Sequence, residues 1–226
     1  EHYQPGNAMV FCNTKKQCAE VAAFLQEHDI EAAAIHGDLD QRDRDQVLLQ
    51  FTNNSCPVLV ASDVAARGLD IPALAMVVNF ELPRDGDTYV HRIGRTGRAG
   101  ETGQAFSLVT PSEAPRLRVI EDHLDINCLC DVLESLNRNP NYQLQGDMAT
   151  LQLDAGRKQK LRPGDILGAL TGDAGLAGDQ IGKIKILDNS SYVAIVRSAL
   201  RQAMNYLAQG KIKGRSIRVR RLKLHR

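Results

Sequence analysis

The stretch from His91 to Arg98 (His-Arg-Ile-Gly-Arg-Thr-Gly-Arg) places an arginine at every third position, with two glycines among them. This spacing lets one or two helical turns carry several guanidinium groups on one face, and guanidinium groups match the geometry of phosphate. Gly94 and Gly97 would each cost about 0.8–1 kcal/mol relative to alanine inside a helix, so their presence favours close approach of a ligand or of backbone. The pattern therefore favours a polyphosphate site, and a solvated or salt-bridged helix end is the alternative.

The first half of the chain must position this stretch, and it alternates short apolar runs with amphipathic segments. We expect strands at 8–12, 32–35, 58–61, 76–79 and 104–109, and helices at 15–28, 41–51, 64–68, from about 87, and at 111–136. This alternation predicts an α/β fold with a parallel sheet and helices on both faces. Ligands bind at the carboxyl ends of such strands, so the polar loops that follow the strands should share one edge. Each loop taken alone is also compatible with an ordinary turn or helix N-cap.

The second half predicts a separate α+β domain with the RRM-like element order β-α-β-β-α-β. Strands are expected at 150–153, 181–187, 192–196 and 216–222, and helices at 162–170 and 197–209. A turn-rich break near residues 137–141 separates the halves. We therefore place a first domain at 1–140, a linker at 141–147 and a second domain at 148–226.

Charge divides along the same boundary. Residues 1–146 hold 12 Lys and Arg against 21 Asp and Glu, a net charge of −9, whereas residues 147–226 hold 16 against 6, a net charge of +10. This asymmetry suggests two domains with different tasks, the second of which faces a polyanion.

Alternation locates the basic residues of the second domain. In the strands around 183–186 and 217–220 the apolar residues must face the helices, so the basic ones lie on the opposite, open face. The residues that we expect to contact RNA are Lys183, Lys185, Tyr192, Lys211, Lys213, Arg215, Arg218 and Arg220. Such charge can serve solubility alone, but a strong positive balance without glutamate favours RNA. Asp188 and Ser190 stand where an RRM motif has a basic and an aromatic residue, so recognition through phosphates and shape is favoured over base stacking.

Composition excludes several classes of protein. The chain has no apolar run of about 18 residues that could span a bilayer, and no segment typical of a signal peptide, so we expect a soluble, cytoplasmic protein. Its five cysteines lack CxxC spacing, which argues against disulfides and zinc. We interpret them as reduced core thiols and predict no metal site within the chain.

Four motifs in the first half resemble, in order and spacing, those of the second RecA-like lobe of DEAD-box RNA helicases. They are Phe11–Lys15, His36–Asp38 with Gln41 and Arg44, Ala61–Pro72, and His91–Arg98. The resemblance implies that His91 and Arg92 link two helicase lobes across a cleft. It implies that Arg95 and Arg98 are catalytic arginine fingers, a role worth roughly 1,000-fold or more in rate. Nucleotide contacts would come from Gly68, Asp70, Arg95 and Arg98, and RNA phosphates would meet Thr14, Gly37, Arg44 and Ser62, where the family more often has threonine.

Two other helicase features are absent from the sequence. It contains no G-x-x-x-x-G-K-[ST] loop and no Asp-Glu-Ala-Asp run. The phosphate cradle and the ligands of Mg²⁺ would therefore belong to a first lobe outside this chain. Because the chain also begins with Glu1, we expect a fragment of an enzyme that uses ATP with Mg²⁺, and we predict that the fragment alone does not hydrolyse ATP.

The second half resembles the RNA-binding domain of the DbpA group of bacterial DEAD-box helicases, through Leu161–Gly172 and Ile181–Ile184. This resemblance implies binding of a hairpin of large-subunit ribosomal RNA, delivery of the adjacent duplex for local ATP-coupled unwinding, and action on a pre-ribosomal particle during ribosome assembly. We expect a monomer that does not contact membranes. The alternative is a stand-alone RNA-binding or scaffold protein whose helicase-like lobe is not catalytic.

Overall fold

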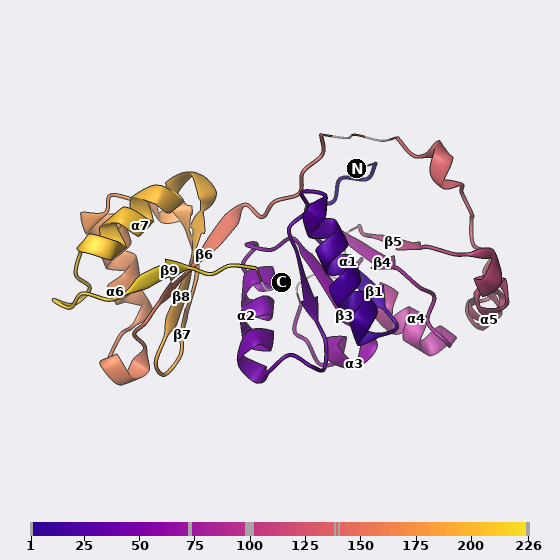
Figure 1. Ribbon diagram of the computed structural model, residues 1–226, viewed down its shortest axis with the longest axis horizontal. Helices are drawn as coiled ribbons and strands as arrows, with labels where there is room; N and C mark the ends of the chain where they lie inside the picture. The colour runs from indigo at the N-terminus through magenta and orange to yellow at the C-terminus, as the bar shows by residue number, and fades with distance from the viewer. Residues whose placement is uncertain (1, 72–73, 98–101, 138, 140, 225–226) are drawn as a thin grey trace. The chain divides into compact units, whose positions relative to one another are not determined.

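The computed structural model describes residues 2–71, 74–97, 102–137, 139 and 141–224. The chain forms two compact units (Figure 1). The first contains residues 1–48 and 57–145, and the second contains residues 49–56 and 146–224. The helix at residues 41–52 is therefore divided, and its residues 49–52 belong to the second unit.

The first unit is built on a parallel sheet of five strands in the order β2-β3-β1-β4-β5. The strands are β1 (Ala8–Cys12), β2 (Ala32–Ile35), β3 (Val58–Ser62), β4 (Met76–Asn79) and β5 (Gln104–Ser107), and the helices are α1 (Lys15–Glu27), α2 (Gln41–Thr52), α3 (Asp63–Ala66), α4 (Gly86–Ile93) and α5 (Ala114–Leu124), with short 3-10 turns at Pro111–Glu113 and Leu133–Ser135. The predicted parallel sheet with alternating helices is confirmed.

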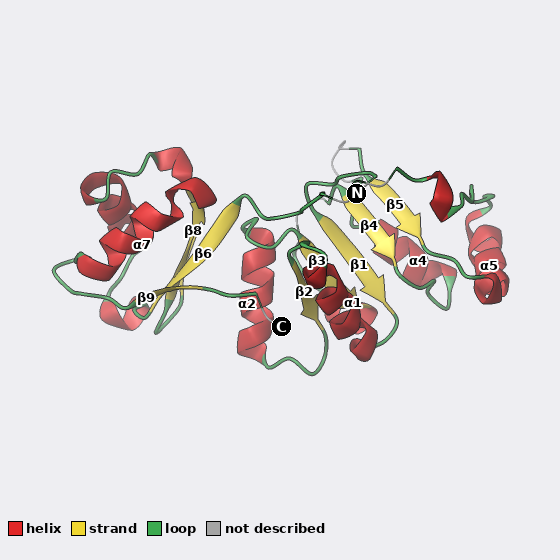
Figure 2. Cartoon of the chain, turned by 45° about the horizontal axis from the view of Figure 1, so that its top comes forward, coloured by secondary structure: helices red, strands yellow, loops and turns green. Residues whose placement is uncertain are grey.

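Different helices bury the two faces of this sheet (Figure 2). On one face, Val10 packs with Cys18 of α1 in a continuous apolar cluster. The neighbouring strand residues Met9 and Phe11 alternate to the opposite face and are also buried. The helix α4 lies on that second side, because the Arg92 guanidinium sits over the Phe11 ring at 5.2 Å from its centroid. Because helices cover both faces, the polar loops lie at the carboxyl ends of the strands.

The helix predicted at 111–136 is shorter than expected. The helix α5 ends at Leu124, where Asp125 adopts a left-handed conformation with φ of 52° and stops the helical hydrogen bonding. Beyond it, Ile126, Val132 and Leu133 are exposed, and Leu129 is fully accessible. The apolar spacing that continued past Leu124 thus does not correspond to a buried helical face.

The second unit contains an antiparallel sheet in the order β7-β8-β6-β9, with the element order predicted from the sequence. Its strands are β6 (Met148–Leu153), β7 (Ile181–Ile186), β8 (Ser191–Val196) and β9 (Val219–Arg221), its helices are α6 (Pro163–Gly168) and α7 (Leu200–Gln209), and its shorter turns are the 3-10 turns Arg157–Gln159, Gly178–Gln180 and Arg197–Ala199 and the π-helical turn Ala169–Asp173. The predicted α+β fold is confirmed.

Two details of this unit differ from the prediction. The helix predicted at 162–170 is continued by a π-helical turn that contains Gly172, and Gly175 follows with a positive φ of 69°. The last strand is also shorter than the predicted 216–222 and covers only Val219–Arg221. Only three residues of β6, from Leu151 to Leu153, pair with β9.

The cysteines divide into two groups. Cys12, Cys18 and Cys56 are buried free thiols, as predicted for core residues, whereas Cys128 is half-buried and Cys130 is exposed. The core interpretation is therefore wrong for the last two, which follow the end of α5. Among the described residues, no helix is long and apolar enough to cross a membrane.

Candidate functional site

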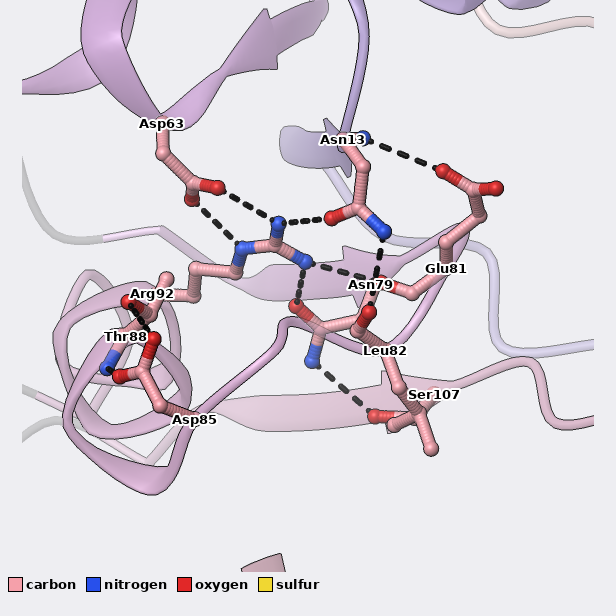
Figure 3. A network of polar contacts seen from close by, with 9 residues as sticks. All are labelled: Asn13, Asp63, Asn79, Glu81, Leu82, Asp85, Thr88, Arg92 and Ser107. Carbon is pink, nitrogen blue, oxygen red and sulfur yellow. Dashed lines mark hydrogen bonds and ion pairs between the residues drawn. The ribbon is translucent and has the colours of Figure 1, made fainter. Parts of the chain in front are cut away.

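The helix α4 carries the first part of the arginine stretch and is fixed at both ends. At its start, the Asp85 carboxylate accepts hydrogen bonds from the Thr88 backbone N–H at 2.8 Å and from the Thr88 hydroxyl at 3.0 Å (Figure 3). These bonds hold the pKa of Asp85 below its ordinary value of 3.8. At its end, the Gly94 N–H donates to the Val90 carbonyl at 2.8 Å, and Gly97 has a positive φ of 64°. The helix therefore ends at Ile93, directly before Gly94.

Arg92 is almost completely buried, with 1% of its surface exposed. Its Nε and one Nη donate to both carboxylate oxygens of Asp63, at 2.7 and 2.8 Å. The remaining N–H groups donate to Asn79 Oδ1 at 3.1 Å, to the Glu81 carbonyl at 2.9 Å and to Asn13 Oδ1 at 2.8 Å (Figure 3). These five hydrogen bonds use all five N–H donors of the guanidinium.

This environment holds Arg92 within the first unit, and the interlobe role predicted for it stays a prediction. A side chain that is buried, paired with Asp63 and saturated with hydrogen bonds cannot reach across a cleft without breaking them. Withdrawing it would leave the Asp63 charge and the Asn79 amide without their partner, a change that costs several kcal/mol for buried ion pairs. In this structure Arg92 is an internal link within the first unit. The neighbouring His91 is exposed, so its interlobe role stays a prediction.

An open pocket of about 240 Å³ lies beside this network. It is lined by Phe11 of β1, by residues that follow β3, and by α4 and the turn after it. The residues after β3 are Asp63, Ala66, Arg67 and Gly68, and those from α4 onward are Thr88, His91, Arg92 and Arg95. Arg95 donates from one Nη to the Leu69 carbonyl at 3.2 Å, so its guanidinium is held against the loop after α3. The pocket thus joins Gly68 and Arg95, two of the predicted nucleotide contacts.

The predicted nucleotide contacts are only partly placed. Gly68 has a positive φ of 72° and no atom within 4 Å of the position of a Cβ, so both the turn and the free space above it suit close approach of a ligand. Asp70 is exposed two residues further on. Arg98 lies outside the described residues, and its predicted role as a second finger stays a prediction.

The predicted RNA contacts of the first unit lie at or just after the ends of neighbouring strands and, for Arg44, on α2. Thr14 follows β1, Ser62 ends β3 and Gly37 follows β2, and these three strands are adjacent in the sheet. Thr14 also caps α1 by accepting from the Gln17 N–H at 3.2 Å. Arg44 of α2 donates to the Ala65 carbonyl at 2.8 Å, which ties it to the β3 loop. The sheet therefore brings the four residues to one edge, as predicted from strand ends.

A surface ion pair connects two of these loops. The Lys15 ammonium, next to Thr14, lies 2.8 Å from the Asp38 carboxylate, next to Gly37. Hydrogen bonding from Lys15 lowers the pKa of Asp38. Because both side chains are exposed, the pair adds little stability, but it links the loops that follow β1 and β2.

Alternation in the second unit places the basic residues as expected. The apolar partners Ile184, Ile186, Ile217 and Val219 pack against the helical core. The strand register then aligns one row across the opposite face, in which Lys185 pairs with Tyr192, Tyr192 with Gln152, and Gln152 with Arg220. The predicted face is thus a sheet surface with a cation on each outer strand.

The residues at the centre of that row are buried, whereas those at its ends are exposed. Lys185 and Arg220 are exposed, but Tyr192 and Gln152 are only 4% and 3% exposed. Tyr192, predicted as an RNA contact, is therefore buried in this structure, and its contact with RNA stays a prediction. Along the edge, Lys213 is paired with Asp165 at 3.1 Å.

Four residues of the Arg92 network were not identified from the sequence as site residues: Asn13, Asp63, Asn79 and Glu81. One signal was available for Asn79, because an amide that ends an apolar strand and is fully buried requires a hydrogen-bonding partner. Asn13 and Asp63 also follow strand ends. Their common partner could not be inferred because it is 79 and 29 residues away, respectively.

Comparisons with known proteins agree with both parts of this architecture. Residues 1–100 match the family described as the helicase conserved C-terminal domain, and residues 150–221 match the DbpA RNA-binding domain. The structure resembles that of the Escherichia coli DEAD-box protein SrmB, with a TM-score of 0.57, 36% identity, and coverage of 63% of this chain and 85% of that one. It also resembles the C-terminal domain of the DEAD-box protein Dbp5, with a TM-score of 0.52, 36% identity, and coverage of 56% and 74%.

Among curated proteins, the ATP-dependent RNA helicase DbpA of Escherichia coli is 51% identical over 221 residues, which is 98% of this chain and 48% of the relative. Its counterpart in Bacillus subtilis is 33% identical over 235 residues, which covers 95% of this chain and 49% of that protein. The chain belongs to the DEAD-box RNA helicase family and corresponds to the C-terminal part of its DbpA type. It spans about half the length of these relatives.

Proposed function

We propose that this chain is the second lobe and the RNA-targeting domain of an ATP-dependent RNA helicase. The observation that carries the proposal is the pocket in which Arg95 of the arginine stretch meets Gly68 of the loop after β3. The edge that carries Thr14, Gly37 and Ser62 belongs to the same sheet. A nucleotide-facing pocket and a phosphate-binding edge on one lobe suit an enzyme that couples ATP to RNA.

The residues of the pocket fit ATP. Gly68 leaves space for a ligand above a left-handed turn, and Arg95 supplies a fork of N–H donors for phosphate oxygens. When bound with Mg²⁺ held by a first lobe, ATP supplies the phosphoryl group whose transfer is coupled to unwinding. In this account Arg95, together with Arg98, stabilises charge on that group, and Asp70 contacts the sugar.

The RNA substrate we propose is structured ribosomal RNA, in particular a hairpin of the large subunit within a pre-ribosomal particle. The support is the match of residues 150–221 to the DbpA RNA-binding domain and the charge of +10 on residues 147–226. Contacts to phosphate carry no base information, so the edge of the first lobe would hold neighbouring RNA without sequence preference. We propose that the protein acts as a cytoplasmic monomer in ribosome assembly.

Complementation by a first lobe tests the enzymatic part. In a protein in which a DEAD-box first lobe precedes this chain, we expect ATP hydrolysis that rises when hairpin RNA is added, whereas the chain alone hydrolyses no ATP. Absence of hydrolysis in the two-lobed protein would favour the stand-alone RNA-binding protein instead. Hydrolysis by the chain alone would also contradict the proposal, because the ligands for Mg²⁺ are assigned to the other lobe.

The RNA-binding face is tested with the full chain and a ribosomal hairpin RNA. Changing Lys185 and Arg220 to alanine should weaken binding and lower the slope of log affinity against log salt by about 2, since each phosphate contact contributes about 1. The matched control changes Arg116 and Arg118 of α5, which removes the same charge from the first unit. Equal affinity and slope for the two variants would show that another face binds RNA.

A further inference from the structure

Two of the groups that Arg92 binds are chain neighbours of proposed RNA contacts. Asn13, whose Oδ1 accepts at 2.8 Å, directly precedes Thr14. Asp63, whose carboxylate accepts two hydrogen bonds, directly follows Ser62. One guanidinium thus holds both loops immediately beside the residues expected to meet RNA phosphates (Figure 3).

The same arginine is part of the helix that leads to the ATP-facing pocket. Arg92 and Arg95 are separated by less than one helical turn, and the Arg95 N–H donates to the Arg92 carbonyl at 3.2 Å. The Arg95 carbonyl in turn accepts from the Leu74 N–H at 3.2 Å. A displacement of the Arg92 guanidinium therefore has a short, hydrogen-bonded route to Arg95.

A third set of contacts anchors Arg92 to β4. Its other Nη donates to Asn79 Oδ1 and to the Glu81 carbonyl, at 3.1 and 2.9 Å. Asn79 is fully buried and also donates to the Ser107 hydroxyl at 3.0 Å, so this side is the rigid part of the network. Neither Asn79 nor Glu81 is adjacent in the chain to a proposed RNA contact.

We propose that Arg92 is a positioning residue that couples RNA binding at the strand ends to the placement of Arg95 at ATP. The inference rests on the proposed function and specifies how its two sites communicate. RNA that engages Thr14 and Ser62 fixes the loops of Asn13 and Asp63, and these fix Arg92 and the end of α4. A lysine at this position cannot substitute, because it has three donors at one point and no planar fork.

The test measures coupling rather than activity alone. In the two-lobed protein, the dissociation constant of a non-hydrolysable ATP analogue is determined with and without single-stranded RNA, and the ratio gives the coupling. Thermodynamic linkage requires that the analogue change the dissociation constant of the RNA by the same factor as RNA changes that of the analogue. Couplings in proteins are typically about 5- to 150-fold, so we expect RNA to tighten analogue binding within this range.

Three variants separate positioning from stability. Asn13→Ala removes one contact of Arg92 on the RNA side and should reduce the coupling at least about threefold, a change well within the usual range of coupling. Asn13→Asp keeps the acceptor for Arg92 and should restore the coupling. Asn79→Ala removes a more deeply buried contact on the β4 side, so it should lower thermal stability more than Asn13→Ala does while keeping the coupling.

Each outcome is decisive for one of the two ideas. An unchanged coupling in Asn13→Ala, or an equal loss in Asn79→Ala, would overturn the positioning role while the helicase function stands. If the unaltered two-lobed protein binds both ligands without any coupling, the positioning role is overturned as well. If it binds no ATP analogue at all, the proposed function itself fails.

Discussion

The Asp63 carboxylate accepts hydrogen bonds from both Nε and an Nη of Arg92, at 2.7 and 2.8 Å, in a two-point pair that joins the start of α3 to α4. Two-point pairing of this kind fixes orientation as well as distance. Because Arg92 is buried, the pair is shielded from salt and solvent. The arginine stretch therefore has two parts, an inner residue that organises the lobe and outer residues available to a ligand.

Replacing the inner arginine should destabilise the first unit strongly. Arg92→Ala leaves the Asp63 charge and the Asn79 side-chain oxygen without the donors that Arg92 supplies, and loss of one member of a buried pair costs about 3–5 kcal/mol. Urea unfolding followed by circular dichroism measures the change. Arg116→Ala, on the exposed surface of α5, is the control and should change stability little. If Arg92→Ala lowered stability no more than this control, Arg92 would not be the residue that organises the first unit.

The N-cap of α4 should give a pH-dependent contribution. Asp85→Ala removes the acceptor for the Thr88 N–H and should cost about 1 kcal/mol at neutral pH, as is usual for N-caps. Since the pKa of Asp85 is lowered in the folded protein, its ionised form is favoured by folding. This contribution is complete above about pH 5, where a carboxyl with the ordinary pKa of 3.8 is almost fully ionised, and is lost as the pH falls through the lower pKa of the folded state.

Comparing urea midpoints of the unaltered chain and of Asp85→Ala at pH 7 and pH 3 tests this linkage. We expect the difference between them to shrink at the lower pH. Asp85→Asn keeps an acceptor without the charge and should lie between the two at pH 7. A difference that grows on acidification would contradict the assignment of the lowered pKa to this cap.

Two glycines of the second unit should respond to alanine in opposite directions. A Cβ at Gly156 would lie 2.1 Å from the Leu187 carbonyl oxygen, which belongs to the backbone and cannot swing away. We expect Gly156→Ala to destabilise the unit by about 1–3 kcal/mol, the usual range for overpacking. Gly168, the last residue of α6, has helical angles and nothing within 4 Å of a Cβ, so alanine there should stabilise by about 0.5–1 kcal/mol.

Thermal unfolding of both variants provides the measurement, with the unaltered chain as reference. Equal effects in the two variants would mean that the close approach between Gly156 and the turn after β7 does not exist in solution. The comparison is informative because both changes add the same methyl group within one unit.

The parts of the fold set by local periodicity were predictable. The apolar run at β1 and the alternation around β7 specify which side chains face the core, and both predictions are confirmed. Periodicity failed beyond Leu124, where apolar spacing continues but Asp125 ends the helix. It also failed at Ala169–Asp173, because a π-helical turn depends on how the backbone accommodates its tertiary contacts.

The candidate site was predictable only where strand ends converge. Thr14 and Ser62 follow from the rule that loops after parallel strands share an edge. The partners of Arg92 did not follow, because Asn13 and Asn79 become its neighbours only when β1 and β4 pair. A motif can thus indicate that an arginine is needed without indicating whether it faces a ligand or the interior.

The most direct test of the whole account is the RNA-stimulated turnover number for ATP hydrolysis of the two-lobed protein with Arg95→Lys, which keeps the charge but removes the fork. Arg116→Lys serves as the control. The account predicts a fall in kcat of about 1,000-fold, the lower end of what arginine fingers contribute, with RNA binding retained. An unchanged kcat would contradict the assignment of this pocket to ATP.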